Sequence, residues 1–238
     1  VQAGRHVFSL DFRGHGDSDR SPTGYHWEGF ADDVLAVIDD LGLAHEPTLL
    51  AAGHSKGAAA LLLAEARVPD TFARLWCYEP IMVPGKEPLE PSLDNPLSAG
   101  ALKRRFVWDS PDEAFAAFSA KPPLNALTPD ALHAYIEYGL RARVDGRYEL
   151  KCLPEDEAAM FSMGLAHSAY QRLDEVHCPT VIACGEHSNA IGPALAEQLA
   201  AQLPDGRLEV MPGLGHFGPL EDPDAIVASM LWFAAATA

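Results

Sequence analysis

The feature that most constrains this chain is an apolar run that stops at a glycine and then resumes as a helix. Residues 49–66 read LLAAGHSKGAAALLLAEA, and Ser55 stands at the break between the two parts. A short buried strand before the break and an alanine- and leucine-rich helix after it predict a direct strand-to-helix turn. Such a turn holds the serine in a strained backbone conformation while neighbouring segments come close. Glycines, here Gly53 and Gly57, are therefore expected to be needed at both flanks.

The residue types around this turn indicate a serine nucleophile. The turn lifts the Ser55 hydroxyl above the sheet at a helix N-terminus, where free N–H groups and the helix dipole favour developing negative charge. We expect the backbone N–H of Lys56 to act as one oxyanion donor. A chance match of G-x-S-x-G is the alternative, and the predicted strand and helix on either side favour the functional interpretation. The Lys56 side chain is expected to be solvated, with attraction of an anionic substrate as the alternative.

Alternation of short apolar runs with helical patterns predicts an α/β fold with a parallel sheet. Strands are expected at residues 5–10, 47–52, 73–80, 179–186 and 206–212, and helices at residues 29–43, 57–68, 192–203 and 222–237. Residues 84–172 differ, because a proline-rich stretch leads into patterns that are mostly helical, with one short strand near residues 147–153. The prediction is a core formed by residues 1–83 and 173–238, interrupted by a helical insertion at residues 84–172.

The charge and composition exclude some classes of partner. The 238 residues include 34 acidic and 17 basic side chains, a formal net charge of −17, and a field of that sign repels nucleic acid and anionic membranes. The charge says little about a neutral small-molecule substrate, which is the partner we expect. The sequence shows neither a membrane span nor a signal pattern, and its four cysteines lack metal-ligand spacing. We therefore expect a reduced, cytoplasmic protein that uses no metal and no organic cofactor.

A histidine near the C-terminus is the expected general base. The stretch PGLGHFGPLEDP places His216 in a glycine-flanked loop between the last predicted strand and the last predicted helix. Such a loop opens onto the carboxyl end of the sheet, which is the edge where Ser55 is expected. A surface histidine in a turn is the alternative. The position of His216 and its flanking glycines favour the role of a base.

Three motifs in this order resemble the α/β-hydrolase superfamily over essentially the whole chain. They are DFRGHGDSD at residues 11–19, GHSKG at residues 53–57 and GLGHFGPLEDP at residues 213–223. The resemblance implies that the helical insertion is a cap domain between the sixth and seventh strands of the family. It also implies that the turn around His15 is structural and lines one wall of the site, so that His15 is not catalytic.

The triad acid does not stand at its usual position. In the family an aspartate typically follows the seventh strand, where this chain reads Gly-Glu-His-Ser-Asn at residues 185–189, with Ser188 or Asn189 at the expected place. Glu79 ends the sixth strand at the same edge, and some members of the family resemble this arrangement. We therefore expect Glu79 to be the partner of His216, with a structural carboxylate that binds loop backbone as the alternative and Glu186 as the third choice.

The N-terminal part of the family's pattern is missing. The chain opens on VQAGRHVFSL, which resembles the end of the family's first helix followed by its fourth strand. Strands one to three are absent, together with the loop after strand three that donates the second oxyanion N–H. Strand three lies between strands four and five in this family. Either the sequence is a fragment, which we favour, or those two strands close up and pair in an unusual way.

The resemblance implies hydrolysis of a small carboxylic ester through a Ser-His-acid triad and an acyl-enzyme. A C–C bond hydrolase with the same triad is a second enzymatic interpretation. A catalytically inactive scaffold that serves as a binding module is the alternative from another class, motivated by the unusual acid position. Aromatic and methionine side chains of the insertion suggest an apolar lining, but they identify no substrate. The oligomeric state also stays open.

Overall fold

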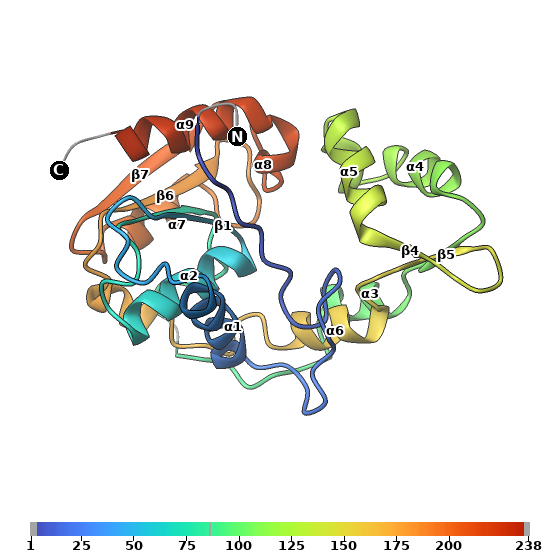
Figure 1. The fold of residues 1–238 in the computed structure, drawn as a ribbon, viewed down its shortest axis with the longest axis horizontal. Helices are drawn as coiled ribbons and strands as arrows, with labels where there is room; N and C mark the ends of the chain where they lie inside the picture. The colour runs from blue at the N-terminus through green and yellow to red at the C-terminus, as the bar shows by residue number, and fades with distance from the viewer. Residues whose placement is uncertain (1–3, 86, 236–238) are drawn as a thin grey trace.

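The protein is built around a four-stranded parallel sheet. The computed structural model describes residues 4–85 and 87–235. The strand order is β1-β2-β6-β7, and every neighbouring pair is parallel (Figure 1). The four strands are β1 (Leu50–His54), β2 (Arg74–Tyr78), β6 (Thr180–Gly185) and β7 (Gly206–Met211). This confirms the α/β fold with a mostly parallel sheet.

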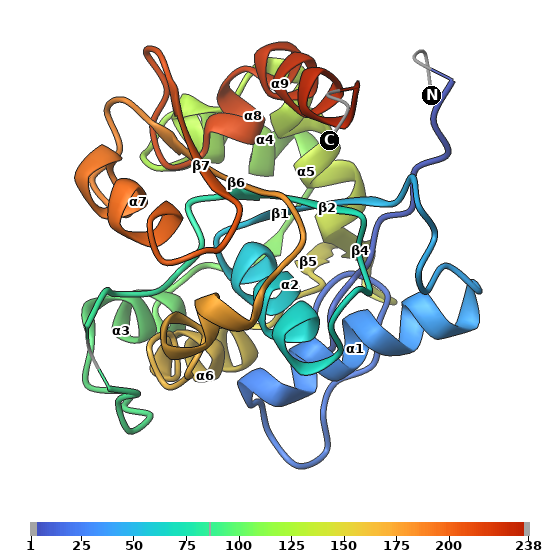
Figure 2. The same cartoon turned by 90° about the vertical axis from the view of Figure 1, so that its left-hand side faces the viewer.

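Helices cover both faces of the sheet. Successive residues of a strand point to opposite faces, so neighbouring residues pack into different cores. Cys77 of β2 joins a core that includes residues of α1 (Trp27–Asp40), α2 (Lys56–Arg67) and α7 (Pro193–Ala200). Trp76, its neighbour in the strand, joins a second core with α9 (Pro223–Ala235). Figure 2 shows α1 and α2 on one side of the sheet and α9 on the opposite side.

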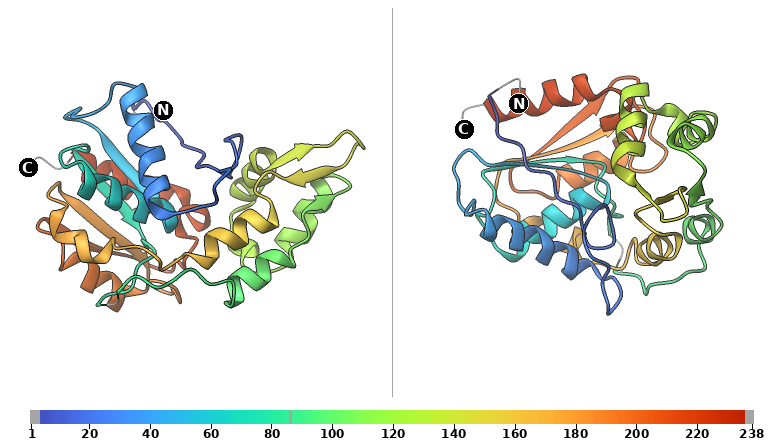
Figure 3. Two further views of the ribbon diagram at one scale, coloured as in Figure 1. Left: turned by 90° about the horizontal axis from the view of Figure 1, so that it is seen from below. Right: turned by 45° about the vertical axis from the view of Figure 1, so that its right-hand side comes forward.

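The segment between β2 and β6 is mostly helical, as the sequence predicts. It also contains a three-stranded antiparallel sheet ordered β3-β5-β4, which extends away from the core (Figure 3). Its elements are α3 (Pro96–Leu102), β3 (Val107–Trp108), α4 (Pro111–Ser119), the 3₁₀ turn η1 (Leu124–Ala126), α5 (Pro129–Gly139), β4 (Leu140–Ala142), β5 (Tyr148–Leu150), α6 (Pro154–Ser162) and the 3₁₀ turn η2 (Tyr170–Glu175). The sequence indicated β5, whereas β3 and β4 are too short to show an alternating pattern.

This segment contacts the core at several places, two of which are described here. At one, the indole N–H of Trp27 in α1 donates to the carbonyl of Met163, just after α6, at 2.6 Å. At the other, the backbone N–H of Thr128 donates to the carbonyl of Leu220 at 2.9 Å. Leu220 belongs to α8 (Gly218–Glu221), a short helix that the sequence pattern did not predict. The second contact lies four residues from His216.

The strand predicted at residues 5–10 is wrong. Residues 5–12 are irregular, and Val7 and Phe8 expose 64% and 47% of their surface. A strand needs a paired neighbour, and β1 pairs only with β2 among the described residues. Direct pairing of the N-terminal segment with β1 is therefore wrong as well. The predicted end of the last helix, residues 236–237, lies outside the described residues.

Within the part of the chain that the structure describes, no helix combines the length and the apolar character that crossing a membrane requires.

The turn between β1 and α2 has the strained geometry expected of it. Ser55 has φ 51° and ψ −111°, and α2 begins at the next residue. A Cβ on Gly53 would lie 2.6 Å from the backbone nitrogen of Ala58, so only glycine fits there. A Cβ on Gly57 would meet only a ring carbon of Phe12 at 3.9 Å, which is ordinary contact. The expectation that both flanks need glycine is thus wrong for Gly57.

Alanine at these two positions should give opposite results. Gly53→Ala forces the start of α2 away from β1, and we expect the free energy of unfolding to fall by about 1–3 kcal/mol. Gly57→Ala lies in a helix with room for a methyl group, and we expect a change of less than about 1 kcal/mol, in the stabilising direction. Urea denaturation of both variants measures this difference. Equal losses would contradict it.

Candidate active site

Ser55 and Glu79 follow two paired strands at the same edge of the sheet. The register pairs His54 of β1 with Tyr78 of β2, so the next residue of each strand lies at the carboxyl end. The backbone N–H of Ser55 donates to the carbonyl of Tyr78 at 2.8 Å. Both Ser55 and Glu79 have positive φ, 51° and 46°. Such strain costs of order 1–3 kcal/mol per residue, and strained residues concentrate at functional sites.

Glu79 and His216 form a short hydrogen bond, as the sequence predicts. The distance from His216 Nδ1 to Glu79 Oε2 is 2.6 Å. A carboxylate only accepts, so Nδ1–H donates and the lone pair of the neutral ring lies on Nε2. Glu79 is fully buried, whereas the His216 side chain is 22% exposed. This arrangement orients the imidazole and stabilises the imidazolium that proton transfer to Nε2 would form.

Three further donors hold the Glu79 carboxylate. The backbone N–H of Gly185 donates to Oε1 at 3.0 Å, and the hydroxyl of Ser188 and the N–H of Ile191 donate to Oε2 at 2.7 and 3.3 Å. Burial by itself raises the pKa of Glu79, but the hydrogen bonds from His216, Gly185 and Ser188 lower the pKa below its ordinary value. Glu79 therefore binds loop backbone and His216 at once, so the two roles considered for it coexist.

Glu186 has other contacts. Its carboxylate accepts a hydrogen bond from the N–H of Gly213 at 2.9 Å, and its side chain is 53% exposed. The described contacts of Glu186 do not include His216. Ser188, one of the two residues at the place where an acid is expected from the sequence, instead donates to Glu79.

Two residues that the sequence analysis missed hold the loop of His216. The hydroxyl of Tyr78 donates to the carbonyl of Gly215 at 2.7 Å. The carboxylate of Glu221 accepts from the N–H groups of Gly215 at 2.7 Å and Phe217 at 3.1 Å. An acidic residue five positions after the histidine, in the first turn of a short helix, is a sequence signal for Glu221. Tyr78 carries no such signal, because it fits the apolar pattern of a buried strand.

His54 also lies at the site. Its ring packs against that of His216 with centroids 4.8 Å apart, and its Nε2 has no hydrogen-bond partner. Burial, with a smaller contribution from His216, lowers the pKa of His54 to about 4. His54 is therefore neutral at neutral pH and does not repel an imidazolium at position 216.

The structure brings the Ser55 hydroxyl to the same edge as His216 without a hydrogen bond between them. Among the described residues the hydroxyl has no hydrogen-bond partner, and the contact between the two segments is the one through His54. Lys56 is the first residue of α2, so the helix leaves its backbone N–H unused, as an oxyanion donor requires.

The Lys56 side chain is not solvated, contrary to expectation. It is partly buried, and its Nζ lies 2.9 Å from Nε2 of His15 and 3.5 Å from Sδ of Met160. Burial lowers the pKa of Lys56 to about 8. The His15 turn thus lines the site, and His15 contacts the residue that follows Ser55. Across the described residues, no three His, Cys, Asp or Glu side chains gather where they could hold a metal ion.

Comparison with known proteins places this geometry among hydrolases. A family model described as "Alpha/beta hydrolase family" matches residues 1–229. The chain is 29% identical to a 2-(acetamidomethylene)succinate hydrolase of Mesorhizobium japonicum, over 89% of this chain and 72% of that protein. It is 26% identical to a bifunctional esterase/perhydrolase of Acinetobacter calcoaceticus, over 98% of this chain and 83% of that protein.

A solved structure shows the same fold. The crystal structure of an E-2-(acetamidomethylene)succinate hydrolase matches with a TM-score of 0.78 at 25% identity, over 95% of this chain and 80% of that one.

Removal of the Ser188 hydroxyl should weaken the hold on Glu79. We expect Ser188→Ala to lower the free energy of unfolding at neutral pH by about 1.5–3 kcal/mol, the range for a hydrogen bond to a charged group. Because the folded-state pKa of Glu79 is depressed, this stability exists above the unfolded pKa and is lost as pH falls through the folded pKa. The difference between wild type and variant should therefore shrink in acid. Ser119→Ala, at an exposed serine, is the control in urea titrations, and a gap independent of pH would contradict the assignment.

His54 should make the protein acid-sensitive. Its pKa is 6.5 in the unfolded chain and about 4 in the fold, so the unfolded state binds more protons between these values and stability falls as pH is lowered. We expect His54→Gln to reduce the slope of the unfolding free energy against pH in this window. The reduction corresponds to the uptake of up to about one proton on unfolding. His177→Gln, at an exposed histidine, should leave the slope unchanged. An unchanged slope in His54→Gln would show that His54 titrates normally.

Proposed function

Because the chain belongs to the alpha/beta hydrolase family, we propose that it is a serine hydrolase that cleaves a small carboxylic ester through Ser55, His216 and Glu79. The observation that carries this proposal is the 2.6 Å hydrogen bond between His216 and the buried Glu79 at the sheet edge where the strained Ser55 stands. Nucleophile, base and acid follow β1, β7 and β2, so three different strands supply them.

In the proposed reaction His216 Nε2 takes the hydroxyl proton of Ser55 while the oxygen attacks the ester carbonyl carbon. The resulting oxyanion accepts a hydrogen bond from the Lys56 N–H at the start of α2. His216 then gives its proton to the leaving alcohol, and an acyl-enzyme forms. Water, deprotonated by His216, attacks the acyl carbon. As the bond from the acyl carbon to the Ser55 oxygen breaks, His216 gives this proton to the Ser55 oxygen, and the acid product is released. Glu79 stabilises the imidazolium in both halves of the reaction.

The missing hydrogen bond between Ser55 and His216 is compatible with this role. Catalytic hydrogen bonds are often long or poorly aligned without substrate and tighten in the substrate complex. The ring of His216 packs against that of His54, the residue before Ser55, so the two segments that carry the hydroxyl and Nε2 are in contact.

We further propose that residues 84–172 act as the cap of the site, between core parts 1–83 and 173–238. This segment contacts the core beside the His216 loop, through the Thr128–Leu220 hydrogen bond, and beside Lys56, through Met160. Both contacts flank the carboxyl edge of the sheet. Side chains of the segment would therefore select the substrate.

An ester is proposed because relatives include an esterase of Acinetobacter calcoaceticus. A carbamate hydrolase is also among them, so the bond cleaved by this chain is the part that experiment must decide.

Hydrolysis of 4-nitrophenyl acetate and butyrate tests the three roles. We expect Ser55→Ala to abolish turnover, because it removes the attacking oxygen, and Glu79→Gln to reduce kcat by at least about 100-fold, because it keeps the volume but removes the charge. Glu90→Gln, at an exposed glutamate, is the control and should behave as wild type. A serine-reactive phosphonate should label wild type and spare Ser55→Ala.

A different result would change the conclusion. If wild type and Ser55→Ala are equally inert and the phosphonate labels neither, the fold serves as a binding module. Turnover by Glu79→Gln at the wild-type rate would remove Glu79 from the mechanism while leaving Ser55 in it.

A further inference from the structure

The side chain of Lys56, the residue after Ser55, carries an ammonium group that the proposed mechanism does not use. Its Nζ donates to Nε2 of His15 at 2.9 Å and reaches Sδ of Met160 at 3.5 Å. It also lies over the rings of Phe30 and Phe12, 4.5 and 5.1 Å from their centroids. All four contacts are electrically neutral, so none of them balances the positive charge.

His15 is neutral because it is buried and lies beside the charge of Lys56. Its Nδ1 lies 3.2 Å from the carbonyl of Arg13, so Nδ1–H donates and the lone pair on Nε2 accepts from Lys56. Burial, followed by the charge of Lys56, lowers the pKa of His15 to about 4. The Lys56–His15 pair thus carries one positive charge, and that charge belongs to Lys56.

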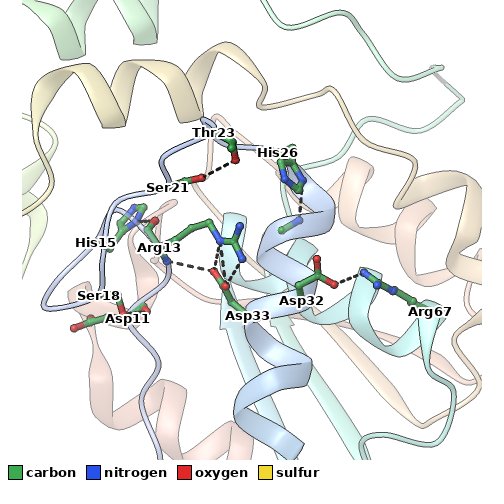
Figure 4. A network of polar contacts seen from close by, with 11 residues as sticks. Asp11, Arg13, His15, Ser18, Ser21, Thr23, His26, Asp32, Asp33 and Arg67 are labelled. Atoms are coloured by element: carbon green, nitrogen blue, oxygen red, sulfur yellow. Dashed lines mark hydrogen bonds and ion pairs between the residues drawn. The ribbon is translucent and has the colours of Figure 1, made fainter.

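Two carboxylates near the Lys56–His15 pair already have other cations. Asp33 accepts from the guanidinium of Arg13 at 2.6 Å, and Figure 4 shows this pair with His15 on the same loop as Arg13. Asp156 accepts from Arg20 at 2.9 Å and from the hydroxyl of Tyr25 at 2.8 Å. None of the ion pairs among the described residues includes Lys56.

A desolvated ammonium group without a carboxylate is unfavourable, and the lowered pKa of Lys56 reflects this. An anion brought to Nζ restores the missing charge balance in a partly dry environment, where such an interaction is stronger than in water. The position is suited to a substrate group. Lys56 follows the nucleophile directly, and its Nζ lies where the core meets Met160 of α6 in the proposed cap.

We propose that Lys56 binds a carboxylate of the substrate, so that the preferred substrates are monoesters of dicarboxylic acids whose free carboxylate lies away from the ester that is cleaved. This inference rests on the proposed function of the same site. A single ammonium group beside a neutral histidine matches one monoanionic carboxylate. A phosphate dianion would need more donors and would be repelled more strongly by a chain of net charge −17.

The experiment compares charged and neutral esters of matched length. The probes are mono-4-nitrophenyl glutarate, adipate and pimelate, each beside the 4-nitrophenyl ester of an unbranched acid with a methyl group in place of the carboxylate. The proteins are wild type, Lys56→Met, Lys56→Arg and the control Lys121→Met, which removes an exposed lysine of the same segment as Met160. The readout is the ratio of kcat/KM for the charged ester to that for its neutral partner.

We expect wild type and Lys121→Met to prefer at least one charged ester by about 10-fold or more, and Lys56→Met to lose that preference mainly through a higher KM. Lys56→Arg should regain part of it, because it restores the charge. If the ratio in Lys56→Met equals that of wild type while both esters are cleaved, the carboxylate site is wrong and the proposed hydrolase function stands.

A binding measurement separates this inference from the proposed function. If no ester is cleaved, the hydrolase proposal fails. The carboxylate site is then decided by the change in Tm that adipate causes. A Tm raised by adipate in wild type and Lys121→Met, but not in Lys56→Met, supports it. No shift, or the same shift in all three proteins, overturns it. Circular dichroism spectra of the variants without ligand confirm that they fold.

Discussion

The pairing of β1 with β2 is the constraint on which the rest of the site depends. Its register places Ser55 and Glu79 side by side, and the Tyr78 carbonyl holds the Ser55 backbone. The Tyr78 hydroxyl holds the loop of His216 through Gly215, and the next residue, Glu79, binds the His216 ring. Two consecutive residues of one strand thus connect to both other members of the proposed triad, so a shift of this strand by one residue would dismantle all of it.

The site holds one negative and one positive side chain away from full contact with water: Glu79, which is buried, and Lys56, which is partly buried. Glu79 stays ionised because four donors surround its carboxylate, while His54 and His15 stay neutral because burial lowers their pKa values to about 4. Lys56, the residue after Ser55, supplies a positive charge through its ammonium group, which contacts His15. Desolvated charges and strained backbone lower the stability of a fold, and functional sites retain them because chemistry needs groups held ready.

Much of the core could be predicted from the sequence, because apolar periodicity and glycine stops act locally. The strand before Ser55, the helix α2 and the helix α9 follow such patterns. Residues 5–10 have a strand-like composition, yet pairing is a long-range property and no neighbour is present among the described residues. The contacts of the Lys56 side chain and the room for a side chain at position 57 could not be predicted either. Both depend on Met160 and Phe12, which the fold brings from distant parts of the chain.

The proposed triad acid shows how a carboxylate from a different position in the chain can serve the same chemistry. His216 Nδ1 needs one carboxylate at one point in space, and either the end of β2 or the loop after β6 can reach that point. Here the loop supplies Ser188 and the N–H groups of Gly185 and Ile191, all of them donors aimed at Glu79. A carboxylate at position 188 would face Glu79 with a like charge and no proton to share, which raises the pKa of one of the two. The serine at 188 and the glutamate at 79 are therefore complementary halves of one arrangement, and their contact supports, beside the hydrogen bond to His216, the proposal that the acid follows β2.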